Sequence, residues 1–112
     1  MYTILNNKKV KVTKCNNLID KIKAFIHKIK DFDYCLCFTK KRFFHTFFKL
    51  SNVDIVMTDK NNKILYLYQS LKPWKIISPK ENVFYTYELA ENDTKTLSLG
   101  DKFKIRTTRN TH

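Results

Sequence analysis

The stretch that decides the fold is VDIVMTDKNNKILYLYQSL, residues 53–71. Two apolar segments of strand length enclose the polar sequence DKNNK, residues 59–63. Asn adopts a positive φ more readily than most residues, and an Asp at the start of a turn can accept hydrogen bonds from the backbone N–H groups that follow. This pattern predicts a β-hairpin whose turn is capped by Asp59.

Further segments of strand character lie on both sides of this hairpin. They cover residues 8–14, 33–38, 43–50, 83–92 and 103–108. The lysines of the first segment favour an edge strand, and residues 72–82 are predicted to form a loop because prolines remove ladder donors. Short strands at steady spacing predict a mainly β single domain over residues 1–112, an antiparallel jelly-roll-like sandwich or small barrel.

One segment has helical periodicity instead. Asn16 or Asn17 can cap its first turn. Its apolar residues form a single stripe, namely Leu18, Ile19, Ile22, Phe25, Ile26 and Ile29. The sequence therefore predicts one amphipathic helix at residues 16–30, which would cover one end of the sheet.

The composition excludes several classes of protein. With 43% hydrophobic residues in 112, the chain can form one core and is not disordered. No apolar run approaches the roughly 18–20 residues of a membrane span, and residues 1–12 lack the apolar stretch of a signal peptide. The three cysteines, with Cys35 and Cys37 two positions apart on a predicted strand, indicate free thiols in a reducing cytoplasm.

The net charge of +12 raises the possibility of nucleic-acid binding, because Lys and Arg gain free energy by displacing phosphate counterions. The alternative is a charged, solvated surface that reflects the lysine- and asparagine-rich bias of an AT-rich genome. The positive charge is concentrated in the N-terminal half. The candidate contact residues are Lys21, Lys23, Lys28, Lys40, Lys41 and Arg42.

An ordered set of short motifs runs through most of the chain. The motifs are HTFF (45–48), VDIVM (53–57), DKNNK (59–63), LKPWK (71–75), YEL (87–89) and LGD (99–101). In this order and spacing the chain resembles a small prokaryotic family of uncharacterised proteins known as domain of unknown function 192. The resemblance covers roughly residues 10–105. It implies a mainly β, jelly-roll-like fold with a helix after the first strand, and it implies no activity.

The chain departs from the family's pattern within these motifs. Lys49 stands where a methionine usually follows the aromatic pair, and Asn52 stands where a proline usually precedes the Val-Asp pair. In the helix, residues 24–26 replace a Gly-Leu-Met step. The first two departures put in doubt whether a site of the family is intact here.

Five residues are candidates for ligand binding: His45, Thr46, Asp54, Trp74 and Glu88. His45 is either a hydrogen-bonded structural residue or a ligand-contacting, acid–base group. Asp54 interrupts an apolar strand, where it either accepts backbone N–H groups or lines a cleft. Trp74 either stacks on a ligand or folds back to plug one end of a barrel. Glu88 is either solvent-exposed or meets His45 or Arg42 across strands.

These residues leave several functions open. The favoured interpretation is a non-enzymatic domain that binds a small molecule or protein in a cleft near His45, Asp54 and Trp74. The alternatives are a nucleic-acid-binding protein and a hydrolase-like enzyme that uses His45 with Asp54 or Glu88. Three scattered histidines do not suggest a metal site, and the single glycine excludes a phosphate-cradling loop, so no cofactor is predicted. The oligomeric state is not predicted.

Overall fold

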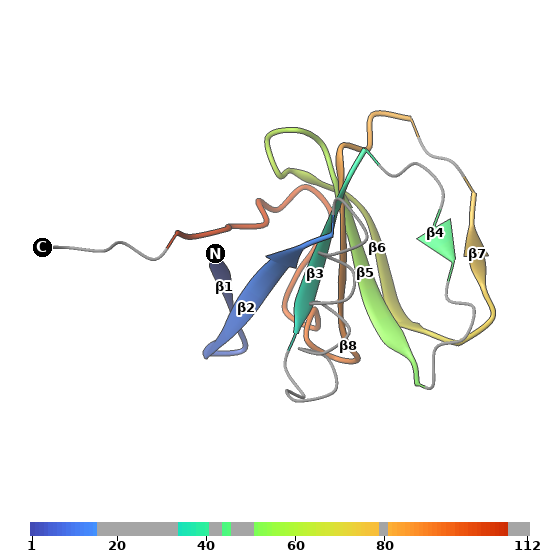
Figure 1. Cartoon of the computed structure of the whole chain (residues 1–112), viewed down its shortest axis with the longest axis horizontal. Helices are drawn as coiled ribbons and strands as arrows, with labels where there is room; N and C mark the ends of the chain where they lie inside the picture. Colours follow the sequence, from blue (N-terminus) through green and yellow to red (C-terminus); the bar gives the residue numbers. More distant parts are fainter. Residues whose placement is uncertain (16–33, 41–43, 46–50, 79–80, 108–112) are drawn as a thin grey trace, which may run out of the picture.

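The structure, a computed structural model, describes residues 1–15, 34–40, 44–45, 51–78 and 81–107, with only the backbone of residues 44–45. The described part is mainly β, as predicted (Figure 1). Its strands are β1 (Tyr2–Leu5), β2 (Lys8–Lys14), β3 (Cys35–Thr39), β4 (Phe44–His45), β5 (Val53–Thr58), β6 (Ile64–Leu71), β7 (Ile76–Ile77) and β8 (Tyr85–Ala90). In this part of the chain no helix is long and apolar enough to cross a membrane.

Six of these strands form one sheet in the order β1-β2-β3-β8-β5-β6. The predicted hairpin is confirmed as β5 and β6, and its turn is capped by Asp59, whose Oδ1 accepts the N–H groups of Asn61 at 2.8 Å and Lys63 at 3.0 Å. A second hairpin joins β1 to β2 through Asn6 and Asn7, which both have positive φ, the geometry that tight hairpin turns require. Sequence reasoning missed β1.

Two predictions about the sheet were wrong. Residues 8–14 form not an edge strand but an interior strand, because β2 lies between β1 and β3. The sheet is mixed rather than antiparallel, because β2 and β3 run parallel. Parallel neighbours need a long crossover connection, which is usually a helix. The connecting residues 16–33, which contain the helix predicted at 16–30, lie outside the described residues.

The main core lies on one face of the six-stranded sheet. This inner face contributes at least one buried residue from every strand: Leu5, Val10, Val12, Cys35, Cys37, Val56, Ile64, Tyr87 and Leu89. The strand β5 is buried on both faces, because Val53, Ile55 and Met57 pack on the opposite, outer face with Ile77 of β7. β7 pairs with β4 in a separate two-stranded sheet that lies beyond β6 in Figure 1.

The C-terminal segment, residues 100–106, closes the inner face. A strand was predicted at residues 103–108, but the described residues of this stretch form no strand, and the segment makes only isolated bridges. At one end, Ile64 of β6 donates its N–H to the carbonyl of Asp101 at 2.8 Å. At the other end, Tyr2 of β1 and Arg106 exchange backbone hydrogen bonds of 2.8 and 2.7 Å. Since β1 and β6 are the two edges of the sheet, this segment joins them around the core.

Two further predictions concern the segments around β4 and β7. Residues 72–82 were predicted to be a loop, yet they contain the short strand β7. This strand forms because it pairs with β4, and no pattern in residues 72–82 predicts that pairing. Of the strand predicted at 43–50, the described residues Phe44 and His45 are extended as expected. Residues 41–43 and 46–50 lie outside the described part.

Candidate functional site

Asp54 is a structural residue in this fold. Its side chain lies on the inner face of β5 and is fully buried. Its Oδ1 accepts the N–H of Ser70 at 2.9 Å, and its Oδ2 accepts the N–H and the hydroxyl of Thr94 at 3.1 and 2.6 Å. Charge-assisted bonds to several donors offset the cost of burying a carboxylate. Asp54 is therefore engaged by the protein itself and does not line a cleft.

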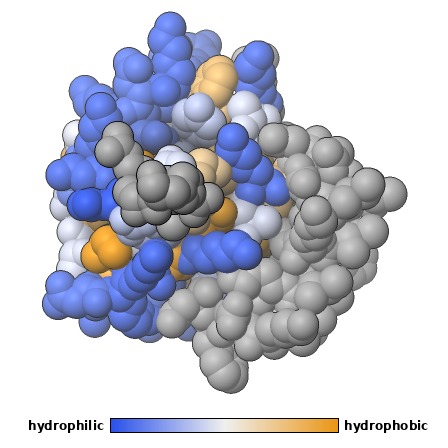
Figure 2. Space-filling view, turned by 60° about the vertical axis from the view of Figure 1, so that its left-hand side comes forward, coloured by the Kyte–Doolittle hydropathy of each residue, from blue (hydrophilic) through white to orange (hydrophobic). Residues whose placement is uncertain are grey.

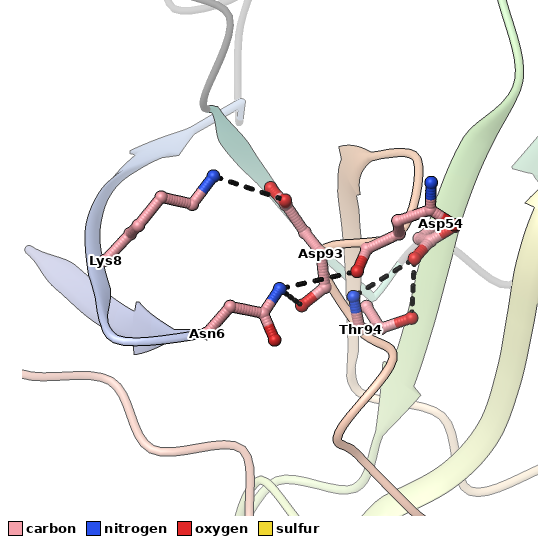
Figure 3. A network of polar contacts seen from close by, with 6 residues as sticks. Asn6, Lys8, Asp54, Asp93 and Thr94 are labelled. Carbon is pink, nitrogen blue, oxygen red and sulfur yellow. Dashed lines mark hydrogen bonds and ion pairs between the residues drawn. The ribbon is translucent and has the colours of Figure 1, made fainter.

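The bonds of Asp54 are part of a network that fastens the turn of residues 91–96 to the sheet (Figure 3). The amide of Asn6 donates to the carbonyls of Asn92 and Asp93, each at 3.4 Å. The ammonium of Lys8 lies 3.9 Å from the carboxylate of Asp93. The turn is thus held by the β1–β2 hairpin on one side and by β5 on the other, and the network closes one end of the core.

Glu88 lies on the opposite face of the sheet from Asp54. It pairs directly with Ile55, and directly paired residues on antiparallel strands share a face, so the neighbouring Asp54 points the other way. Glu88 is fully buried and accepts the hydroxyl of Tyr34 at 3.1 Å. Burial, and then the charge of Glu88, raise the pKa of Tyr34. The structure therefore does not bring Asp54 and Glu88 together, and Glu88 is not solvent-exposed.

The structure does not show whether His45 lies near Asp54 or Glu88. The backbone of His45 pairs with Ile76 of β7, but its side chain is not described. The other candidates beyond the described residues are Thr46, Lys21, Lys23, Lys28, Lys41 and Arg42. Among the described residues, no three His, Cys, Asp or Glu side chains are grouped so that they could hold a metal ion.

Trp74 does not plug a barrel end. Its side chain is 61% exposed, and Ile76, two residues further on, is 55% exposed. The backbone of Trp74 has a φ of 63°, a left-handed conformation that is uncommon for a bulky residue and costs about 1–2 kcal/mol. Such conformations gather at functional sites. Among the predicted ligand-binding residues whose side chains are described, Trp74 is thus the exposed one.

The three cysteines are free thiols, as predicted, and all are buried. Burial raises the pKa of Cys37 to about 11 and raises the pKa of Cys35 well above its usual range. A reactive cysteine needs the opposite arrangement, an accessible thiol with a lowered pKa. These thiols therefore pack the core and are poor nucleophiles.

Sequence reasoning missed one surface entirely, here called the basic face. It consists of Tyr2, Ile4, Lys9, Lys11 and Arg106. Tyr2 pairs directly with Lys11 of β2 and with Arg106 of the C-terminal segment, and Ile4 pairs with Lys9. Paired residues share a face, so these five side chains project from the same side of three adjacent segments. The alternation of Lys9 and Lys11 with buried valines was visible in the sequence, but their partners were not.

The charged residues of the basic face are all cations. Lys9, Lys11 and Arg106 are exposed, and Ile4 is 46% exposed. The Lys9 ammonium lies 4.4 Å from the centroid of the Tyr2 ring, within the range of a cation–π contact. The three segments, residues 2–5, 8–14 and 102–107, contain no Asp or Glu. This side of the molecule is largely hydrophilic, with a few apolar residues between (Figure 2).

Among the described residues, no carboxylate belongs to the basic face. Asp54, Glu88 and Asp93 are buried in the fold. Asp59 and Asp101 accept backbone N–H groups in their own turns. In the described part of the chain every lysine and arginine is exposed. Glu81, Glu91 and Asp101 stay exposed, but three carboxylates of the described part are buried and no cation is, so the surface of this part is more strongly positive than its residue composition implies.

The fold has counterparts among solved structures. No family model matches the chain, and no curated protein matches it. A crystal structure of a protein of unknown function from Novosphingobium aromaticivorans is similar, with a TM-score of 0.63 at 10% identity, over 90% of this chain and 80% of that one. A candidate transcription regulator from Sinorhizobium meliloti also has a TM-score of 0.63, at 16% identity, over 90% of this chain and 88% of that one. At these identities the likeness shows the fold alone.

Proposed function

We propose that this chain is a non-catalytic domain that binds single-stranded nucleic acid on its basic face. The observation that carries the proposal is the row Arg106–Tyr2–Lys11, in which two cations flank an aromatic ring on adjacent segments. Adjacent segments in a sheet lie about 4.8 Å apart, and alternate residues along a strand about 6.7 Å apart. Lys9 and Lys11 thus lie at the spacing of successive phosphates, while Tyr2, whose ring contacts the Lys9 ammonium, offers its remaining surface to a base.

Three features favour binding over catalysis. The carboxylates of Asp54 and Glu88 are buried on opposite faces of the sheet, so the two share no cleft. The thiols are buried as well. The lysines of β2 also have no role as guards of a sheet edge, because β2 is an interior strand. Lys9 and Lys11 are exposed and do not pair with a carboxylate of the described residues, which is what a polyanion-binding surface requires.

The shape of the basic face favours a single strand over a duplex. A β-ribbon that reads the major groove must protrude so that it can enter the groove. Here β1 and β2 are flanked by β3 on one side and by the C-terminal segment on the other. They form part of a broad surface, on which a flexible strand can lie with its bases against aromatic side chains.

The test is a titration of labelled single-stranded and double-stranded oligonucleotides against the full chain. The variant Lys9→Ala/Lys11→Ala should weaken binding of the single strand at low salt by roughly tenfold or more. A matched control, Lys63→Ala/Lys95→Ala, removes the same charge from exposed positions outside the basic face and should bind like the wild type. Equal losses in the two variants would reduce the proposal to non-specific attraction by net charge. Preference for the duplex would contradict the single-strand proposal.

A second candidate function is contact with a protein partner at Trp74 and Ile76. Two large, exposed apolar side chains, one with strained backbone, favour it. Pull-downs with the wild type and with Trp74→Ala/Ile76→Ser would show whether any protein depends on this patch. Identical sets of retained proteins would argue against it.

The remaining expectations are consistent with this proposal. Three free cysteines fit a reducing, cytoplasmic location. The resemblance to domain of unknown function 192 and its jelly-roll-like fold stay predictions. That family supplies no activity that would favour one candidate function over another.

A further inference from the structure

A depression separate from the basic face lies beside the turn of the β5–β6 hairpin. Its volume is about 460 Å³, which falls within the usual range of small-molecule sites. It is lined by the turn residues Asp59, Lys60 and Asn61, by Leu65 of β6, and by Asn82, Val83 and Phe84 before β8. The lining therefore combines apolar side chains with amides, a lysine and an aspartate.

The walls of this depression are fixed by hydrogen bonds. Phe84 donates its N–H to the carbonyl of Thr58 at 2.8 Å and accepts the N–H of Lys40 at 2.6 Å. Below the turn, Asn62 Oδ1 accepts the hydroxyls of Tyr87 at 2.6 Å and Thr58 at 3.3 Å. The site is thus preformed, and a ligand would not have to order the turn.

The backbone around the depression is also unusual. Lys40, Asn62 and Asn82 all have positive φ, with values of 57°, 63° and 66°. A positive φ is common for Asn but uncommon for Lys, so Lys40 is the unusual case. Residues held this way are often found at ligand sites. Here Lys40 is placed so that its ammonium lies 5.6 Å from the centroid of the Phe84 ring.

The charges at the depression favour an anion joined to an aromatic group. Lys60 lines it directly, and Lys40 approaches over the Phe84 ring. The lining also holds one carboxylate, Asp59, whose Oδ1 accepts the N–H groups of Asn61 and Lys63, and the two lysines outnumber it. Phe84, Val83 and Leu65 supply the apolar contact that a planar ring needs.

We infer that this depression binds a nucleoside monophosphate, with the base against Phe84 and Val83 and the phosphate beside Lys60 and Lys40. The choice of ligand class rests on the proposed function, because a nucleotide of a bound strand carries the same two groups. The site itself is built from residues other than those of the basic face. It can therefore be tested without the basic face.

The experiment is a binding titration by NMR chemical-shift mapping on the full chain, with adenosine 5′-monophosphate, adenosine and inorganic phosphate as probes. The monophosphate should shift the backbone signals of residues 59–61 and 82–84, and it should bind at least about fivefold more tightly than adenosine. Phe84→Leu keeps an apolar side chain but removes stacking, and should weaken binding at least about fivefold. Lys60→Ala should remove the preference for the monophosphate over adenosine.

Two controls make the outcome decisive. Lys95→Ala, which lies outside the lining, should bind the monophosphate like the wild type. Lys9→Ala/Lys11→Ala should also bind the monophosphate like the wild type. If the wild type binds the monophosphate but no oligonucleotide at its basic face, the proposed function is wrong and this inference still holds. The inference is overturned if a folded Phe84→Leu variant binds the monophosphate unchanged. It is also overturned if adenosine binds equally well, if inorganic phosphate alone accounts for the binding, or if the shifts map elsewhere.

Discussion

The carboxylate of Asp54 accepts both the backbone N–H and the side-chain hydroxyl of Thr94, at 3.1 and 2.6 Å, across 40 residues of sequence. Both residues are fully buried. This pairing fixes the turn that follows β8 against the middle of the sheet. A residue that the sequence offered as a ligand-binding candidate thus has a structural role.

Replacing Asp54 should cost stability. In Asp54→Asn, an amide that is itself a donor would face the N–H groups of Ser70 and Thr94. We expect the free energy of unfolding to fall by about 1–3 kcal/mol, the cost of leaving buried donors unsatisfied. Thr94→Ser keeps the hydroxyl and serves as the matched control, with a smaller loss. Urea unfolding measures both, and a variant as stable as the wild type would contradict the structural role.

Phe103 should be needed to close the core. It is 1% exposed, its ring lies 4.5 Å from that of Tyr87, and it sits in the segment that joins the two sheet edges. Phe103→Ala should lower the free energy of unfolding by about 3–5 kcal/mol. The neighbouring Lys104→Ala changes an exposed side chain and should stay within about 0.5 kcal/mol of the wild type. Similar stabilities for the two variants would show that the segment does not close the sheet.

Stability should fall in alkali because of the buried thiols. The pKa of Cys37 is raised by burial from 9.0 to about 11. An unfolded chain loses this proton first, so between these values the native state binds more protons and stability declines as pH rises. Below pH 9 the neutral Cys37 thiol makes its full contribution to the free energy of unfolding. Urea unfolding under reducing conditions at pH 8 to 11 should show the decline, in which Cys35 also takes part, and Cys37→Ala should show less of it. A flat profile would contradict the buried, neutral thiols.

The fluorescence of the protein should report an exposed tryptophan. Trp74 is the single Trp of the chain and is 61% exposed. Its emission should therefore lie close to that of the unfolded chain, and acrylamide should quench it readily. A blue-shifted, quench-resistant emission would show that Trp74 is covered in solution.

Local chemistry accounts for what the sequence predicted well. The β5–β6 hairpin and the role of Asp59 follow from residues next to one another, so residues 53–71 were sufficient. Alternation along residues 53–58 also places Asp54 on the face opposite to Val53 and Ile55. The sequence could not show whether that face is open, because the answer depends on Thr94, far away in the chain. Only the hydrogen-bond partners of Asp54 distinguish a structural role from a role in ligand binding.

Long-range pairing accounts for what was missed. Whether β2 pairs with a parallel or an antiparallel neighbour depends on the path of residues 16–33, and both pairings suit the same alternating residues. The closing segment makes single bridges to two distant strands, which no local pattern encodes. The basic face arises from the same cause, because Arg106 joins Tyr2 and Lys11 only after the edges of the sheet are connected.

The salt dependence of single-stranded oligonucleotide binding tests the central claim most directly. The logarithm of the association constant should fall linearly with the logarithm of salt concentration, and each phosphate contact contributes about 0.7 to the slope. The slope of Lys9→Ala/Lys11→Ala should therefore be smaller than that of the wild type by about 1.4, whereas Lys63→Ala/Lys95→Ala should keep the wild-type slope. Identical slopes for the wild type and the Lys9→Ala/Lys11→Ala variant would contradict nucleic-acid binding at the basic face.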